Sequence, residues 1–216
     1  MDVNERLRKA AQAGSESELK SLLQEPGCDA LSKANNGSTA LMWAARFGRE
    51  GCVRLLLPVS DALAKDEDAD GWTALMWAAG YGHEGCIELL LPVSDALSKD
   101  GHGSTALMWA ARFGREGCVR LLLPSSDALA KDEDGWTALM WAAWSGHEGC
   151  VRTLLPVSAP LSKNEEGFTA RELARDGGHE SLAQFIEAYA LALRELASIG
   201  KAARPGVPRE HAALRV

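Results

Sequence analysis

One segment occurs four times in this chain, and it constrains the fold more than any other feature. The copies begin at Gly37, Gly71, Gly103 and Gly135 and read GSTALMWAARFGREGCVRLLLP, GWTALMWAAGYGHEGCIELLLP, GSTALMWAARFGREGCVRLLLP and GWTALMWAAWSGHEGCVRTLLP. Their first glycines are 34, 32 and 32 residues apart, and a degraded fifth copy follows at Gly167. Repeats with a period of about 20–50 residues bury their apolar faces against neighbouring repeats. The chain is therefore predicted to fold as an all-α repeat solenoid.

Each copy predicts two short helices and a loop. Thr39 precedes a run of helix formers, so its hydroxyl is placed to cap a first helix, which Gly48 should end. A second helix is expected over about residues 50–57, and Pro58 should close it. The stretch up to the next copy holds mostly turn and charged residues, which predicts a projecting hairpin loop. The repeat is thus helix, tight turn, helix, hairpin.

At these residues the chain resembles the ankyrin repeat family, whose pattern is G-x-T-P-L-H-x-A-A-x-x-G-H followed by a leucine-rich helix. The matching positions of the second copy are Gly71, Thr73, Leu75, Ala78, Ala79, Gly82, His83, Leu90 and Leu91. Ala and Met replace the proline and histidine of the motif. The resemblance covers about residues 5–187 and implies an ankyrin repeat stack of helix-turn-helix units with hairpin loops. The TALMWAA segment looks like that of arrays expanded in some protozoan parasites.

The repeats divide the chain into seven expected segments. These are an N-terminal capping repeat (1–36), four repeats (37–70, 71–102, 103–134 and 135–166), a C-terminal capping repeat with an extended helix (167–199) and a disordered tail (200–216). Arg8 and Lys9 stand where interior copies have Met and Trp, as expected of an outer face without a neighbour. Both ends therefore predict a whole array. Apolar residues of the last helix beyond Glu187 need a cover, from the preceding repeat or from another chain.

Composition restricts the partners and the compartment. The net charge is −7, which disfavours binding to a nucleic-acid backbone. No apolar run of about 18 residues and no signal-peptide core occur, so no membrane contact and a cytoplasmic location, with the nucleus as an alternative, are expected.

The cysteines are predicted to be structural. Four of them recur at one position of successive second helices, and stacked helices about 8–10 Å apart are too distant for disulfides. These are Cys52, Cys86, Cys118 and Cys150. They are expected to be buried, reduced and inert. Cys28, in a loop, is expected to be the most reactive thiol.

No catalytic, metal or cofactor site is predicted. Residues 66–71 match the start of an EF-hand loop, but Trp77 stands where the twelfth-position glutamate is required, so a hairpin tip is the preferred interpretation. His83 and its copies recur at a helix start, where no nucleophile or second carboxylate accompanies them. The chain is therefore not expected to be an enzyme.

Residues that vary while the rest of the repeat is constant are the candidates for partner binding. In ankyrin proteins these positions line the concave face and the hairpin tips. The candidate partner-binding residues are Arg46, Phe47, Trp72, Tyr81, Arg112, Phe113, Trp136, Trp144 and Phe168. Trp72, Trp136 and Trp144 are interpreted as exposed anchors with no core to fill. The alternative is that each lies flat over the neighbouring hairpin.

The predicted function is that of a protein-binding scaffold or adaptor, with a partner of unknown identity, in a monomeric chain. The alternative is a structural component that self-associates, as a dimer, through residues 181–199. Residues 37–68 and 103–134 are identical except that Val59 becomes Ser125, so a two-repeat block has been copied. Arg46 and Arg112, with the phenylalanines that follow them, are then either two selected docking sites or simple inheritance.

Overall fold

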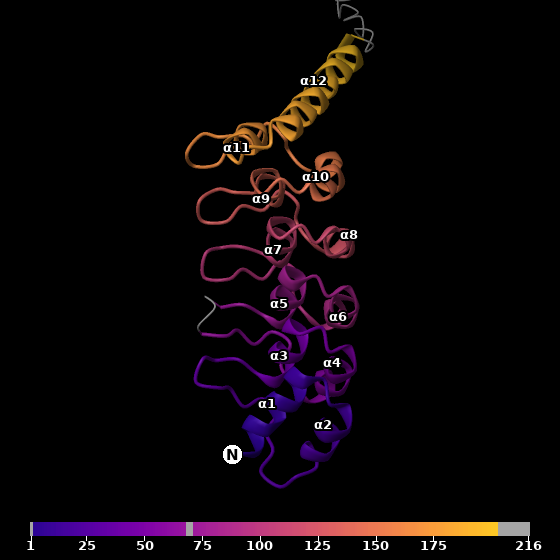
Figure 1. Ribbon diagram of the computed structural model, residues 1–216. Helices are drawn as coiled ribbons and strands as arrows, with labels where there is room; N and C mark the ends of the chain where they lie inside the picture. Colours follow the sequence, from indigo (N-terminus) through magenta and orange to yellow (C-terminus); the bar gives the residue numbers. More distant parts are fainter. Residues whose placement is uncertain (1, 68–70, 203–216) are drawn as a thin grey trace, which may run out of the picture.

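The computed structural model describes residues 2–67 and 71–202, in which helices follow one another in stacked pairs (Figure 1). The first helices of the pairs are α1 (Val3–Ala13), α3 (Ala40–Arg46), α5 (Ala74–Tyr81), α7 (Ala106–Arg112), α9 (Ala138–Trp144) and α11 (Ala170–Asp176). The second helices are α2 (Glu16–Leu22), α4 (Glu50–Leu56), α6 (Glu84–Leu90), α8 (Glu116–Leu122), α10 (Glu148–Leu154) and α12 (Glu180–Ala202). These described ranges contain no strand, and the predicted all-α solenoid is confirmed.

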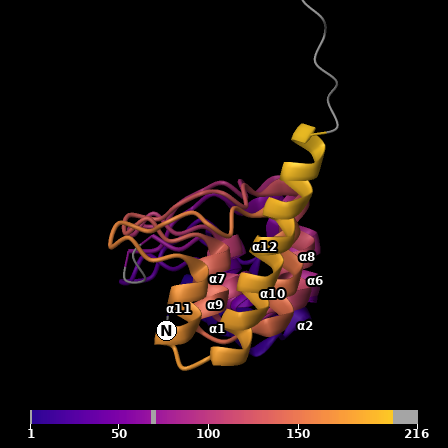
Figure 2. The ribbon, with the colours of Figure 1, turned by 90° about the horizontal axis from the view of Figure 1, so that it is seen from above.

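The hairpin loops all project from the same side of the stack. Figure 1 shows them to the left of the first helices, with α2 to α10 on the right, and Figure 2 shows the same separation from above. The first helices contact one another in sequence, α1 with α3, α3 with α5 and onward to α11, and the second helices α2 to α10 do the same. Two parallel layers result, and the loops and first helices share one continuous face.

The helix ends form as the sequence predicts. The Thr73 hydroxyl accepts a hydrogen bond from the Met76 N–H at 3.3 Å, and Gly82 ends α5 with φ of 87°, a conformation that glycine adopts without strain. Met42 partly replaces the histidine of the family motif, because its sulfur accepts the Thr39 N–H at 3.4 Å. The α4 helix stops one residue before the predicted boundary, and residues Leu57–Val59 form a 3-10 turn around the proline.

The core runs through all the repeats without interruption. Ala44 and Ala45 are fully buried, and small side chains there let neighbouring helices approach closely. The four repeated cysteines are buried and free, and burial raises the pKa of Cys86 to about 12. These thiols therefore have the predicted structural role. Cys28 is half-buried, and burial together with the nearby Asp29 and Glu25 raises its pKa too, which disfavours its reactive thiolate form.

The last helix extends beyond the stack. Leu182 and Ile186 are buried where α12 packs on α11, and Arg152 of α10 lies over the Phe185 ring at 4.1 Å. From Leu191 onward, every side chain that is described on α12 is exposed, and the helix rises away from the repeats (Figure 2). The predicted tail begins later than residue 200, because residues 200–202 belong to α12, and residues 203–216 lie outside the described part. Within residues 2–67 and 71–202, no helix combines the length and apolar character needed to cross a bilayer.

Candidate partner-binding surface

Tryptophan and arginine side chains stack in one column where the first helices meet the hairpin loops. In contact order the column comprises Trp43, Arg46, Trp77, Trp72, Trp109, Arg112, Trp141, Trp136 and Trp144. The closest ring contacts are between Trp72 and Trp109, at 4.3 Å, and between Trp136 and Trp141, at 4.4 Å. This aromatic column joins successive repeats on the side of the stack that carries the hairpin loops.

The two column arginines lie between rings of adjacent repeats. The Arg46 guanidinium carbon is 4.5 Å from the Trp77 ring centroid and 5.5 Å from that of Trp43. Arg112 repeats the arrangement, at 4.4 Å from Trp141. A partly desolvated cation over an indole contributes about 1–2 kcal/mol. Both arginines therefore hold repeats together in addition to facing the surface.

The variable positions differ between repeats for a packing reason. The tryptophan of the TALMWAA segment is present in all four copies, and we call these residues the constant tryptophans (Trp43, Trp77, Trp109 and Trp141). Against each of the last three there is room for one large side chain from the preceding repeat. In one repeat Arg46 fills this space, and the residue before the capping threonine is the small Ser38. In the next repeat Trp72, the equivalent of Ser38, fills the space, and Gly80 is the equivalent of Arg46. A Cβ on Gly80 would come within 3.4 Å of the Trp72 ring. The serine–arginine and tryptophan–glycine pairs are alternative solutions to the same contact.

Trp72 and Trp136 are therefore not the freely exposed anchors that the sequence suggested. Both are half-buried and pack against the core. Trp72 contacts the rings of Trp77 and Trp109, and Trp136 contacts those of Trp141 and Trp144. The statement that they have no core to fill is wrong. Trp144 differs, since 38% of it is exposed at the end of the column.

Carboxylates of the hairpin loops point inward and orient the constant tryptophans. Asp66, Asp100 and Asp132 each accept the indole N–H of Trp77, Trp109 and Trp141, respectively, at 2.8 Å. Their other oxygens accept backbone N–H groups of the same hairpins. Burial raises the pKa of the Asp132 carboxyl, while the Trp136 and Trp141 hydrogen bonds oppose this rise. From the sequence, residues 66–71 are interpreted as a hairpin tip, which does not predict that these carboxylates turn inward. Their fixed spacing of nine residues to Trp109 and Trp141 was the available signal.

A groove near the C-terminal end brings four of the candidate residues together. Its volume is about 290 Å³, and its lining includes Arg112, Trp136, Trp144, Phe168 and two exposed carboxylates, Glu166 and Asp176. Phe168 is 46% exposed, so the groove has an accessible apolar wall.

The remaining candidates are separated along the surface. Phe47 stacks on Trp43 and Phe113 on Trp109, while Tyr81 contacts both Trp77 and His83. All three are at least 36% exposed. They form a row of aromatic edges beside the column rather than one pocket.

Other polar groups on this face have structural partners. His83 Nε2 lies 2.9 Å from the Arg46 carbonyl oxygen and His147 Nε2 lies 3.0 Å from that of Arg112, so these histidines link one repeat to the next. The Asp66 carboxylate is already bound to two N–H groups. Within the described residues, no three His, Cys, Asp or Glu side chains form a group suited to a metal ion.

Comparisons with known proteins agree with this architecture. A family model described as ankyrin repeats (3 copies) matches residues 7–100 and 93–165. A comparison with curated proteins gave no match. The matched residues contain most of α1, the helices α2 to α10 and the whole aromatic column, whereas α11 and α12 follow the matched segment. The chain belongs to the ankyrin repeat family.

Proposed function

We propose that this protein is a scaffold or adaptor that binds a protein partner on the concave face, over the exposed edge of the aromatic column. Ankyrin repeats imply a general protein-binding role. The observation that carries the specific proposal is the groove at Trp144 and Phe168. Aromatic side chains around an arginine, together with exposed carboxylates, have the composition of an interface centre with a polar border.

The arrangement fits a partner with one or more apolar side chains flanked by basic groups. An apolar residue would fill the groove against Trp136 and Trp144, and a lysine or arginine would reach Glu166 or Asp176. Phe113 and Tyr81 extend the contact along the stack, since each is 44% exposed. The half-buried Trp72 contributes by holding this surface in place.

Substitutions at the exposed positions test the proposal. Trp144→Ala and Phe168→Ala should each weaken capture of the native partner, by about tenfold or more for an anchor residue. Arg54→Ala and Arg120→Ala are matched controls, because both arginines are exposed on second helices, on the other side of the stack. Binding isotherms with the captured partner provide the measurement. Loss of binding in the arginine controls with retention in the aromatic variants would place the partner on the opposite face.

A second candidate function is self-association through α12. Leu191, Leu193 and Leu196 are 50%, 41% and 65% exposed on the part of the helix that extends beyond the repeats. A dimer through this segment would cover them. Light scattering should then show a concentration-dependent dimer that Leu193→Gln with Leu196→Gln abolishes. A monomer at all concentrations contradicts this second function and leaves the first unaffected.

A further inference from the structure

The first hairpin lacks the carboxylate that the three following hairpins share. Ala34 occupies the position of Asp66, Asp100 and Asp132, because its N–H donates to the Ser38 carbonyl at 2.9 Å just as the Asp100 N–H donates to Ser104. The register of the loop is thus unchanged. Only the carboxylate side chain is missing, and the three equivalent aspartates of the same chain show what occupies this position in the later hairpins.

Trp43 consequently keeps an unused hydrogen-bond donor. The indole N–H groups of Trp77, Trp109 and Trp141 each bind an aspartate at 2.8 Å. The Trp43 indole has no hydrogen-bond acceptor among residues 2–67 and 71–202. The Ser38 N–H, by contrast, has found a substitute in Asn36 Oδ1 at 3.1 Å.

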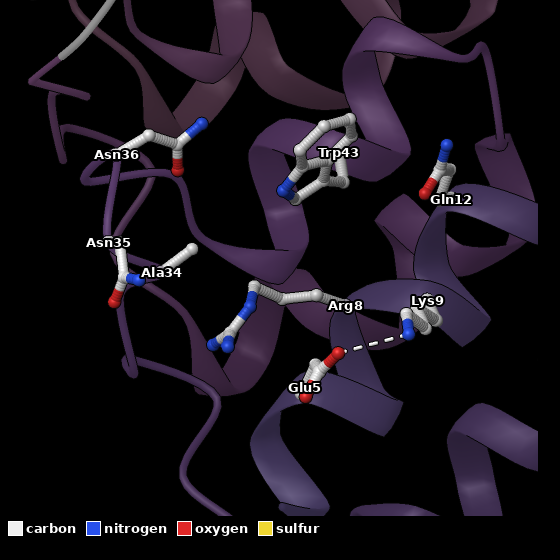
Figure 3. A pocket seen from close by; sticks show the side chains of 8 residues that line it. All are labelled: Glu5, Arg8, Lys9, Gln12, Ala34, Asn35, Asn36 and Trp43. Carbon is white, nitrogen blue, oxygen red and sulfur yellow. Dashed lines mark ion pairs between the residues drawn. The ribbon is translucent and has the colours of Figure 1, made fainter. Parts of the chain in front are cut away.

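A cation lies beside the same space. Figure 3 shows the Arg8 side chain passing from α1 beneath Trp43 toward Ala34 and Asn35. Its Nη1 atom is buried, and it has no hydrogen-bond partner within the described part of the chain. A buried guanidinium N–H without an acceptor is energetically costly, so the position favours an incoming anion.

The acidic side chain in the pocket lining, Glu5, already has a cationic partner. Glu5 pairs with Lys9 at 3.0 Å (Figure 3), and this hydrogen bond, with the attraction to Lys9, lowers the pKa of Glu5. The pocket therefore presents a net positive charge, from Arg8, in a chain whose overall charge is −7.

The space is large enough for a side chain from another molecule. The pocket has a volume of about 510 Å³ between α1, the first hairpin and Trp43. Gln12 stands where later repeats place Arg46 and Arg112, so the first repeat has no arginine at the position that lies over the tryptophan of the following repeat. The pocket lies at the end of the aromatic column, on the partner-binding face.

We infer that this pocket binds the carboxylate of an aspartate or glutamate side chain from a protein partner, in the place that Ala34 leaves empty. One carboxylate oxygen accepts the Trp43 indole N–H, and the Arg8 guanidinium donates to the anion. The carboxylates in the following hairpins show that a group of this size and charge fits beside a constant tryptophan. Only the source of the carboxylate rests on the proposed partner-binding function.

The test is an NMR titration of the full ¹⁵N-labelled chain, in which Trp43→Phe identifies the Trp43 indole signal. The probes are acetyl-Gly-Ser-Asp-Ser-Gly-amide, the same peptide with Asn for Asp, and sodium acetate, all at one ionic strength. The inference expects the Asp peptide to shift the Trp43 signal saturably and the Asn peptide to leave it in place. Acetate should bind at least about tenfold more weakly than the Asp peptide, because it lacks the peptide contacts.

Two variants with a matched control locate the site. Arg8→Gln should weaken peptide binding at least about tenfold through loss of a charge-assisted hydrogen bond, whereas Arg54→Gln, with the same change in net charge on α4, should not. Ala34→Asp should raise the melting temperature, move the Trp43 signal without peptide and abolish the response to peptide.

Three outcomes overturn the inference: an Asp peptide that causes no saturable shift, an Asn peptide that binds equally well, or a response that persists in Ala34→Asp. Acetate binding as tightly as the peptide would overturn the assignment to a partner's side chain. If the titration fails but Trp144→Ala still weakens partner binding, the inference about this pocket is overturned and the proposed partner-binding function is retained.

Discussion

Replacement of Asp132 tests whether the hairpin carboxylates hold the loops against the first helices. Asp132 Oδ1 accepts the Trp136 N–H at 2.8 Å and the Asp134 N–H at 3.2 Å, and Oδ2 accepts the Trp141 indole N–H at 2.8 Å. The carboxylate thus joins the loop to α9. Asp132→Ala leaves all three donors without this acceptor.

The expected destabilisation follows from burial. A hydrogen bond to a charged group contributes about 1.5–3 kcal/mol. Water can replace the acceptor at Asp134, which is exposed, but reaches the half-buried Trp136 and Trp141 less well. The burial that raises the pKa of Asp132 also means that the ionised carboxylate bears a desolvation cost, which alanine removes. Together these effects predict a loss of about 2–4 kcal/mol in the free energy of unfolding.

Asparagine separates the indole contact from the backbone contacts. Asp132→Asn keeps an oxygen for the Trp136 N–H but turns an amide N–H₂ toward the Trp141 indole, where two donors cannot bond. The fourth equivalent position supports this reasoning, since Asn164 occurs where Leu173 replaces the tryptophan, and its Oδ1 still accepts the Phe168 N–H at 2.8 Å. Asp132→Asn should cost about 1–2 kcal/mol.

The measurement is the free energy of unfolding in urea for a double-mutant cycle of Asp132→Asn with Trp141→Phe. Equal m values for the four proteins serve as the control that all of them unfold in the same transition. The coupling energy should be about 1–2 kcal/mol. Additivity within about 0.5 kcal/mol, or an Asp132→Ala cost below about 1 kcal/mol, would refute the role assigned to the carboxylate.

Three further predictions concern the column, the core and the last repeat. Trp136→Ala should lower the free energy of unfolding by about 2–3 kcal/mol, less than a fully buried tryptophan would cost, and an unchanged melting temperature would contradict its packing against Trp141. A thiol reagent at neutral pH should modify at most Cys28 in the folded chain and all five cysteines in denaturant. The reason is that the other four thiols are buried, and burial raises the pKa of Cys86, for example, to about 12. Rapid labelling of four or more cysteines in the folded chain would disprove the placement of these thiols in the core. The hydrogen bonds from Thr169 lower the pKa of Glu172, so the stability they add is present above about pH 5 and is lost as pH falls through the lowered pKa. Glu172→Gln should therefore lower the melting temperature at pH 7 but converge with the parent protein in acid, and a constant difference across this range would exclude the effect.

The local features of the fold follow from short stretches of sequence. A threonine before the ALMWAA helix, a glycine after it and a proline after the next helix each act within a few residues, so the helix ends were predictable from local sequence alone. Repetition then predicted the stack, because such a unit cannot bury its alanines and leucines by itself. The buried cysteines followed from the same argument.

The candidate surface depended on contacts that no single repeat contains. Trp72 reaches the next repeat's Trp109, and Arg46 reaches Trp77, so exposure inferred from one copy was misleading. The inward turn of Asp132 and the empty place beside Ala34 appear only when hairpin and helix are brought together. The sequence alone determined the repeat, its helix ends and its core, since these depend on neighbours along the chain. The tertiary structure decided which variable side chains pack and which remain accessible, because packing depends on the spacing between repeats in three dimensions.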